Sequence, residues 1–313
     1  MKNILNVRVL LGATLLFLAA CASQQPPAVV TGPDAGTQPA PVEAKPRIAL
    51  VLGGGGVKGF AHVGVIKVLE AHGIRPDIVV GTSAGSFVGS MYASGMSVFD
   101  LQKVALSMQE SDIRDLTLST QGFLIGEKLQ RFVNEQVKSK PIHQFPIQFV
   151  AVATELSSGE KVAFNYGNAG QAVRASCAIP NVFLPAEIGG KKYVDGGLVS
   201  PVPVKTARDF GADIVIAVDI SAKPKKGVTN LGFWGLLDQS INILSMQALR
   251  MELAMADVVI QPSVQHADAL NLDQRHEFLL EGEQTTQKQI EMIKAKIQAY
   301  KVNSVLLKNK VSS

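Results

Sequence analysis

Cysteine is almost absent from this sequence, and histidine and tryptophan are scarce. Among the 313 residues are two cysteines, five histidines and one tryptophan. Two cysteines cannot build a disulfide framework, and neither belongs to a His or Cys cluster with the spacing of metal ligands. We therefore expect no metal and no organic cofactor. Cys177 has no flanking charge that would lower its pKa, so we interpret it as a buried structural thiol.

The chain also lacks a strong excess of one charge sign. Its 30 Lys and Arg against 26 Asp and Glu give a formal net charge of +4, which falls to +2 without Lys2 and Arg8. This balance is too close to neutral to indicate nucleic-acid binding. With 47% hydrophobic and 18% charged residues, most of the chain is expected to fold, as one large or two small domains.

The charge-free apolar run at residues 9–22 is too short for a transmembrane helix. It holds 14 residues, whereas a helix needs roughly 20 to cross the hydrocarbon core. Because basic residues precede it and small residues follow, its layout is that of a secretory signal. The tetrad Leu18-Ala19-Ala20-Cys21 resembles a bacterial lipobox, in which Cys21 receives a diacylglyceryl group and becomes the mature N-terminus. The alternative is an ordinary secretory signal cleaved after Ala20 or Ala22.

Residues 22–46 have the composition of a linker, rich in Pro, Ala, Gln and Gly and without apolar periodicity. We therefore predict a lipoprotein signal peptide at 1–20, and a lipid anchor with its linker at 21–46. Because Ala22 is not Asp, a resemblance to enterobacterial lipoproteins implies sorting to the outer membrane, facing the periplasm, if the host is Gram-negative. The expected location is the bacterial cell envelope, with Cys21 as the anchor.

The rest of the chain, residues 47–313, alternates short apolar runs with helical patterns. The runs that predict buried strands lie at 47–52, 77–80, 147–153, 214–218 and 258–260. Helical spacing is expected up to Gly73, which suits the left-handed position after a helix, and again from Ala84. This order predicts an α/β fold with a mostly parallel central sheet covered by helices on both faces. The core is expected at about 47–260, followed by a helical region at about 265–313.

A glycine-rich turn at residues 53–59 follows the first predicted strand. Consecutive glycine amides at a helix start form a concavity for an anion, which in a hydrolase is the oxygen of a tetrahedral intermediate. Gly54, Gly56 and Gly59 also satisfy GxGxxG, the fingerprint of a dinucleotide-binding turn. A nucleotide-binding oxidoreductase is therefore an alternative function. Against it, the acids about 20 residues further on do not end a second strand, as a ribose-binding acid should.

The second motif, Gly81-Thr82-Ser83-Ala84-Gly85, fits GxSxG and lies between a predicted strand and a predicted helix. A sharp turn at this place lifts the serine hydroxyl off the sheet, and the glycines relieve the crowding that such a turn creates. Ser83 is then a candidate nucleophile at a helix N-terminus, where the helix dipole favours negative charge. A plain helix cap by Thr82 or Ser83 is the alternative.

The third motif is Asp195-Gly196-Gly197, which by itself is also compatible with an ordinary turn. A buried carboxylate that is hydrogen-bonded to a serine hydroxyl can act as its base, so a dyad needs no histidine. The alternative is a Ser-Asp-His triad with His266 or His276, although both lie in a polar stretch. His62, close to the glycine-rich turn, is interpreted as a packing or hydrogen-bonding residue.

In this order, the three motifs resemble those of the patatin-like phospholipase family of acyl hydrolases. The stretch at 175–185, Ala-Ser-Cys-Ala-Ile-Pro-Asn-Val-Phe-Leu-Pro, is similar to one that the family places before its aspartate. The resemblance covers about residues 46–260 and implies a three-layer sandwich that hydrolyses phospholipids or lysophospholipids. It implies Ser83 as nucleophile and Asp195 as base. The implied oxyanion hole consists of the amides of Gly54, Gly55 and Gly56.

The same resemblance assigns supporting roles to six further positions, which are Lys58, Gly59, Gly81, Gly85, Gly196 and Gly197. Lys58 stands where many members carry Arg, which keeps the charge but loses the planar fork of donors. The implied partner is a membrane lipid as substrate, and protein partners are left open. A protein that keeps the fold but acts as a non-catalytic envelope lipoprotein is a further alternative.

Two more segments are candidates for contact with lipid or with the domain. Residues 230–237 contain Trp234 and follow the basic stretch 223–226, so we hypothesise an interfacial flap over the active site. A loop with Trp234 packed inward is the alternative. At 287–310, isoleucines 290, 293 and 297 share one helical face, which favours a helix packed on the domain with a solvated basic side.

Overall fold

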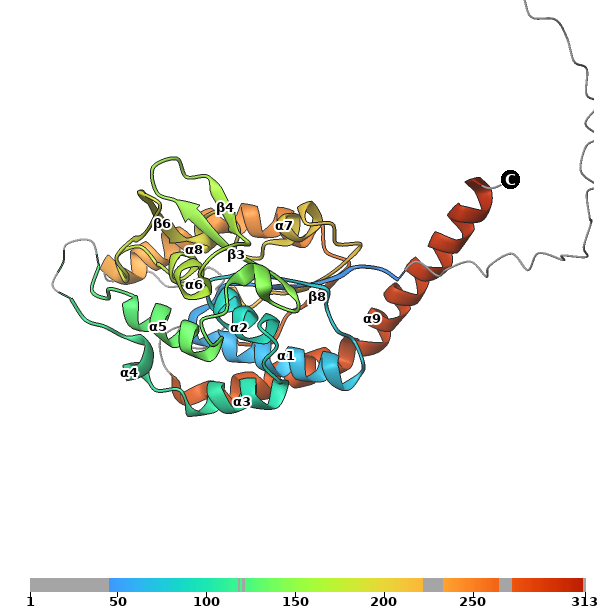
Figure 1. Cartoon of the computed structure of the whole chain (residues 1–313), viewed down its shortest axis with the longest axis horizontal. Helices are drawn as coiled ribbons and strands as arrows, with labels where there is room; N and C mark the ends of the chain where they lie inside the picture. Colours follow the sequence, from blue (N-terminus) through green and yellow to red (C-terminus); the bar gives the residue numbers. More distant parts are fainter. Residues whose placement is uncertain (1–44, 118, 120–121, 222–232, 265–271, 312–313) are drawn as a thin grey trace, which may run out of the picture. The chain divides into compact units, whose positions relative to one another are not determined.

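A mostly parallel β-sheet lies at the centre of the computed structural model, which describes residues 45–117, 119, 122–221, 233–264 and 272–311 (Figure 1). The strands are β1 Ile48–Leu52, β2 Ile78–Thr82, β3 Gln148–Glu155, β4 Lys161–Phe164, β5 Ala186–Ile188, β6 Lys191–Asp195, β7 Ile214–Val218 and β8 Val258–Ile260. Their order is β5-β6-β3-β2-β1-β7-β8, with β4 also paired to β3. β3, β2, β1, β7 and β8 are parallel, whereas β4, β5 and β6 pair antiparallel to their neighbours.

Helices cover both faces of this sheet. They are α1 Phe60–Ala71, α2 Ala84–Ala93, α3 Val98–Ser107, α4 Glu110–Ile113, α5 Glu127–Gln136, α6 Ala169–Ser176, α7 Val204–Asp209, α8 Phe233–Leu253 and α9 Arg275–Val311. Short 3-10 turns are η1 Gly56–Gly59, η2 Ile142–Gln144, η3 Gly196–Leu198 and η4 Leu272–Gln274. The predicted three-layer α/β sandwich is confirmed.

The two faces of the sheet bury different side chains, because successive residues of a strand point to opposite sides. On β1, Leu50 and Leu52 belong to the larger core, which the helices α1, α2, α3, α5, α6 and α9 cover. Ala49 and Val51 face the smaller core with α7 and α8. β1 is therefore buried on both sides, which explains why its sequence is a continuous apolar run.

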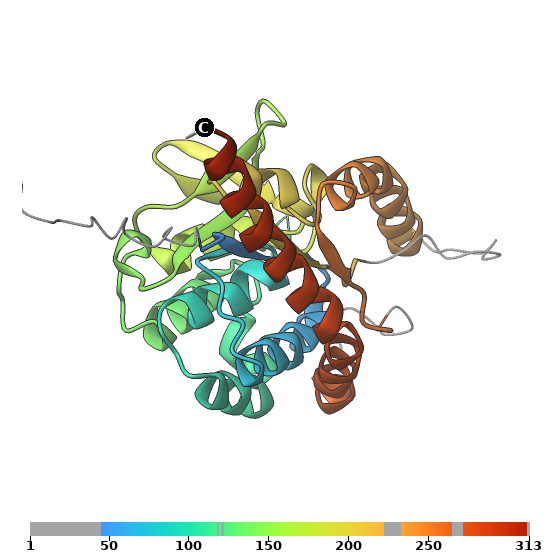
Figure 2. The same ribbon diagram turned by 90° about the vertical axis from the view of Figure 1, so that its right-hand side faces the viewer.

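The C-terminal helix α9 packs along α1 on the larger core, as Figure 2 shows from the side. Ile290 and Ile293 are buried and Ile297 is partly buried, so the predicted apolar helical face is confirmed. The helix spans Arg275–Val311, inside the helical region expected at about 265–313, and it contains the stretch 287–310. In the part of the chain that the structure describes, no helix is long and apolar enough to cross a membrane.

Several sequence-based predictions fall outside the described residues. These include the signal peptide at 1–20, lipidated Cys21, and most of the linker at 21–46. The domain boundaries drawn at those positions therefore stay predictions. The hypothetical flap at 230–237 is described only from Phe233, where α8 begins, so it also stays a prediction.

Candidate active site

Ser83 lies on a strained turn between β2 and α2. Its backbone has φ 51° and ψ −123°, a conformation that side-chain-bearing residues rarely adopt and that is often found at functional sites. Two glycines make the turn possible. A Cβ at Gly85 would lie 1.9 Å from the carbonyl oxygen of Leu52, and a Cβ at Gly81 would lie 2.4 Å from the amide of Ser86. Larger residues at either glycine would push α2 away from the sheet.

The backbone of Ser83 is held by groups on both sides of the turn. Its N–H donates to Ser176 Oγ at 2.9 Å, and Ser176 Oγ donates to the carbonyl of Val152 at 2.6 Å. Its carbonyl accepts from Phe87 N–H at 3.0 Å. Ser176 thus ties the serine turn to β3. Sequence reasoning noted the stretch 175–185 that contains this serine but gave Ser176 no role.

Asp195 comes close to Ser83 because β6 runs against the parallel strands. Thr82 on β2 lies beside Val152 on β3, and Asp195 on β6 lies beside Ala153, the next residue of β3. Ser83 directly follows Thr82. The parallel and the antiparallel registers therefore bring the serine and the aspartate to the same end of the sheet, on either side of β3.

The carboxylate of Asp195 is fixed through one oxygen. Oδ1 accepts from the N–H of Gly197 at 2.7 Å, and the backbone carbonyl of Asp195 accepts from Thr154 Oγ1 at 2.9 Å. Ser83 is close enough for its hydroxyl to lower the pKa of Asp195 through a hydrogen bond. Oδ2 is buried and accepts no hydrogen bond within the described residues. This oxygen is the one available to the Ser83 hydroxyl after a small rotation.

Burial changes the acidity of the groups around Ser83. Burial raises the pKa of Asp195 from 3.8 to about 6, although the hydrogen bonds from Ser83 and from the Gly197 amide lower it in part. Burial, and next the charge on Asp195, raise the pKa of the Cys177 thiol. Cys177 is buried, as predicted, and stays protonated. Asp195 is therefore the group near Ser83 that is both ionised and basic at neutral pH.

The glycine-rich turn passes directly beside the serine, since a Cβ at Gly54 would lie 3.3 Å from Ser83 Cβ. The N–H of Gly54 donates to the carbonyl of Pro201 at 2.9 Å. Of the three amides expected to form an oxyanion hole, this one is already engaged. For the N–H groups of Gly55 and Gly56, the described residues offer no hydrogen-bond partner. Two of the three predicted oxyanion-hole amides, those of Gly55 and Gly56, are therefore available to bind an oxyanion.

His62 fixes the other end of this turn. Its Nε2 lies 2.8 Å from the carbonyl oxygen of Gly53, which can only accept, so Nε2 carries the proton. The ring is fully buried, and burial lowers its pKa to about 4. His62 is therefore neutral at physiological pH, and its interpretation as a hydrogen-bonding residue fits this geometry.

The remaining predicted positions lie in several parts of the chain. Lys58 is buried on η1, and a Cβ at Gly59 would lie 2.8 Å from the Cβ of Ala84. A Cβ at Gly196 would lie 2.3 Å from the carbonyl oxygen of Val152. His276 is exposed on α9, and His266 lies outside the described residues.

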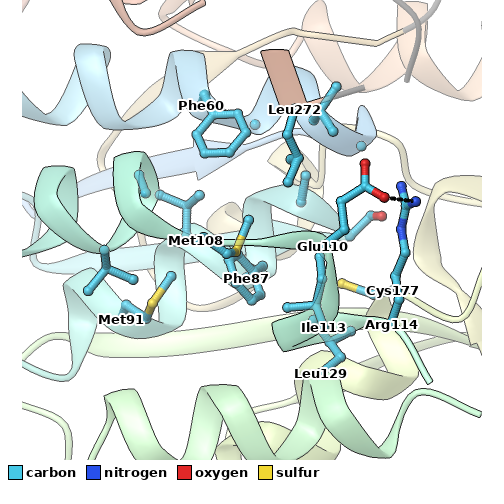
Figure 3. Close-up of a pocket in the computed structure, with 18 of the residues that line it drawn as sticks. Phe60, Phe87, Met91, Met108, Glu110, Ile113, Arg114, Leu129, Cys177 and Leu272 are labelled. Carbon is cyan, nitrogen blue, oxygen red and sulfur yellow. Dashed lines mark hydrogen bonds and ion pairs between the residues drawn. The ribbon is translucent and has the colours of Figure 1, made fainter. Parts of the chain in front are cut away.

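Ser83 lines an apolar cavity, which Figure 3 shows in close-up. Most of its described lining is aliphatic or aromatic, including Phe60, Phe87, Met91, Leu101, Met108 and Leu129. Ser83, Cys177 and Gly56 also line it, so the cavity adjoins both the serine and the glycine-rich turn. Such a space accepts a long hydrocarbon group next to a reactive hydroxyl.

The end of the second strand, β2, does not have the acidic residue that a dinucleotide-binding fold requires. In that fold an acidic residue at the end of the second strand binds the ribose. β2 ends at Thr82 and is followed by Ser83, so the acid is missing from the position where it is required.

The chain is similar in sequence to a known protein family and to several of its members. The sequence profile described as "Patatin-like phospholipase" matches residues 50–208. An uncharacterized NTE family protein of Mycobacterium tuberculosis is 38% identical over 181 residues, 57% of this chain and 50% of the relative. A protein of Debaryomyces hansenii named lysophospholipase NTE1 is 30% identical over 66% of this chain and 14% of its own length. Mouse patatin-like phospholipase domain-containing protein 6 is 31% identical over 62% of this chain and 15% of its own length. The chain thus spans half or less of the length of these relatives.

Proposed function

Since the chain belongs to the patatin-like phospholipase family, whose profile matches residues 50–208, we propose that it is a serine hydrolase of lipid acyl esters. Its substrates are phospholipids or lysophospholipids, with Ser83 as nucleophile and Asp195 as base. The observation that supports this most is the position of Asp195, a buried carboxylate with raised pKa beside a serine on a strained turn. An apolar cavity for the acyl chain adjoins both.

In the first half of the reaction, the Ser83 oxygen attacks the ester carbonyl carbon while its proton passes to Asp195 Oδ2. The carbonyl oxygen becomes an oxyanion, which the N–H groups of Gly55 and Gly56 stabilise together with the N-terminus of α2. The bond from carbon to the leaving oxygen then breaks, and Asp195 gives its proton to that oxygen. The products are a free alcohol and an acyl group on Ser83.

In the second half of the reaction, a water molecule attacks the acyl group on Ser83 by the same steps. Asp195 accepts a proton from the attacking water, the oxyanion forms again, and the bond to Ser83 breaks. Ser83 recovers the proton from Asp195, and the fatty acid leaves. One residue thus serves as base and then as acid in each half, which requires a pKa near the working pH.

Fatty-acid release from phospholipid and lysophospholipid, together with labelling by a fluorophosphonate, tests this function. The expected result is release of free fatty acid and one covalent adduct, located on Ser83 by mass spectrometry. A protein that releases no acid and takes no label would instead be a non-catalytic lipoprotein. Binding of NAD by such an unlabelled protein would favour the oxidoreductase.

The pH dependence of the reaction reports the ionisation of Asp195. Only the ionised carboxylate accepts the serine proton, so kcat/KM should fall about tenfold per pH unit below pH 6 and level off above it. The measurement uses monoacylglycerol, which does not titrate in this range. A midpoint near 3.8, the ordinary value for Asp, would contradict a buried carboxylate as the base.

We also propose that Cys21 carries the lipid that anchors the chain in the bacterial envelope, facing the periplasm in a Gram-negative host. Cys21→Ser should then move the protein from the membrane fraction to the soluble fraction and abolish incorporation of radiolabelled palmitate. Cys177→Ser is the matched control, because Cys177 is buried and should leave the distribution unchanged. Membrane association that persists in Cys21→Ser would argue against the anchor.

A further inference from the structure

Two charged side chains line a cavity that is otherwise largely apolar. Among the described residues that line it, only Glu110 and Arg114 carry a formal charge. Glu110 begins the short helix α4, and Arg114 follows its last residue. Arg114 Nη1 donates to Glu110 Oε2 as an ion pair one helical turn apart. Figure 3 draws this pair with a dashed line. Charges are not needed to hold an acyl chain, so their presence calls for a separate explanation.

The pair stands where the cavity meets solvent. The side chains of Arg114 and Glu110 are 30% and 49% exposed, whereas Met91 and Leu101 in the apolar lining are buried. In the view of Figure 3 the pair lies on the same side as Cys177, and Met91 lies on the opposite side. Ser83 and Cys177 line the same cavity as the pair. The charges thus border the cavity that adjoins Ser83.

An ion pair of this exposure exchanges partners readily. Half-exposed pairs contribute little to stability, because water solvates each charge nearly as well as the partner does. A guanidinium has five N–H donors in a planar fork that matches a phosphate, and it can hold a phosphate and a carboxylate at once. A carboxylate in turn attracts an ammonium group. The pair thus presents a positive and a negative charge side by side.

We propose that Arg114 and Glu110 form a headgroup site for lipids that carry a phosphate next to an ammonium. Arg114 takes the phosphate and Glu110 takes the ammonium, while the acyl chain fills the apolar cavity and the ester carbonyl lies at Ser83. This inference rests on the proposed hydrolase function and adds a preference for zwitterionic over neutral and anionic headgroups.

Three substrates with the same acyl chain test the site. They are palmitoyl-lysophosphatidylcholine, palmitoyl-lysophosphatidylglycerol and monopalmitoylglycerol, presented in the same detergent micelles. Arg114→Gln is expected to lower kcat/KM for both phosphate-containing substrates about 10- to 100-fold, the effect of losing a charged hydrogen bond. Its kcat/KM for monopalmitoylglycerol should stay within about twofold of the wild type, because that substrate has no phosphate.

Glu110→Gln separates the two halves of the site. It should reduce the preference for the choline over the glycerol headgroup about 2- to 5-fold, since only choline carries the positive charge. Arg131→Gln is the matched control, because Arg131 is exposed on α5 and does not line the cavity. It should change none of the three rates. Arg114→Lys, which keeps the charge, should restore part of the activity on both phosphate-containing substrates.

The outcomes distinguish this site from the proposed function. If the wild-type chain hydrolyses none of the three substrates, the hydrolase function fails and the headgroup site fails with it. If the wild type hydrolyses them but Arg114→Gln lowers all three rates equally, or lowers none, only the headgroup site is overturned. Thermal unfolding of each variant identifies an equal loss that comes from misfolding, and Arg114→Lys then decides whether the charge matters.

Discussion

Ser83→Ala is expected to lower ester hydrolysis by roughly 10⁴- to 10⁶-fold and to abolish fluorophosphonate labelling. The hydroxyl is the only group lost, and without it no acyl-enzyme can form. Binding and the glycine amides remain, so a small residual rate above the uncatalysed reaction is expected. The measurement is fatty-acid release at saturating lysophospholipid, with labelling followed by mass spectrometry.

This loss should occur without unfolding. The hydrogen bonds that hold the turn use the N–H and the carbonyl of Ser83, and alanine keeps both. Ser107→Ala, at an exposed serine on α3, is the control and should retain full activity and labelling. A Ser83→Ala protein that is folded yet still hydrolyses lipid at a substantial rate would show that another residue is the nucleophile.

Asp195→Asn is expected to lose activity and gain stability. Asparagine is nearly isosteric but cannot accept the serine proton, so kcat should fall by roughly 10⁴-fold. The ionised carboxylate, however, destabilises the folded state, because burial raises its pKa from 3.8 to about 6. This pKa difference corresponds to about 3 kcal/mol of folding free energy at a pH where the folded carboxylate is ionised.

The gain in stability should depend on pH in a defined direction. A raised folded-state pKa stabilises the wild type at low pH, where Asp195 is protonated in both states, and this advantage is lost as pH rises from about 4 to 6. The free energy of unfolding of Asp195→Asn should therefore match the wild type at about pH 3, below the unfolded pKa. Above pH 6 it should exceed the wild type by a nearly constant amount. Urea denaturation at about pH 3 and about pH 8 measures both values.

Asp257→Asn is the control for Asp195→Asn, and the opposite change in stability is expected. Asp257 pairs with Arg208 and accepts from the N–H of Val215, so its removal should lower stability and leave the rate of hydrolysis unchanged. If Asp195→Asn is also destabilised at pH 8, the buried carboxylate is structural. If its activity survives while that of a His276 or His266 variant is lost, the alternative triad is correct.

The strands and turns that the sequence predicted are those with a purely local signal. β1 and β7 are continuous apolar runs because both faces of each strand are covered, and a run of that kind is visible in any sequence. The turn at Ser83 was predictable because two close backbone approaches exclude side chains at Gly81 and Gly85. In both cases the pattern is visible in a few consecutive residues, although the contact that enforces it at Gly85 is with Leu52 on β1.

The antiparallel edge of the sheet was not predicted. β5 and β6 form a short hairpin with two exposed lysines, Lys191 and Lys192, so the apolar pattern is weak. β4 is only partly buried along its length. These short strands carry no continuous hydrophobic run, and the pairing of β4 and β6 with β3 depends on residues elsewhere in the chain.

The amino-acid sequence by itself determined the sharp serine turn, the glycine-rich turn before α1 and the mostly parallel character of the central sheet. Local backbone geometry and burial on both faces leave few other solutions for those segments. Tertiary structure alone decided three features: the meeting of Ser83 with Asp195, the engagement of the Gly54 amide by Pro201, and the position of the Glu110–Arg114 pair beside the cavity. Each of these depends on the register of strands or on the packing of distant segments, and no local pattern encodes a distance between them.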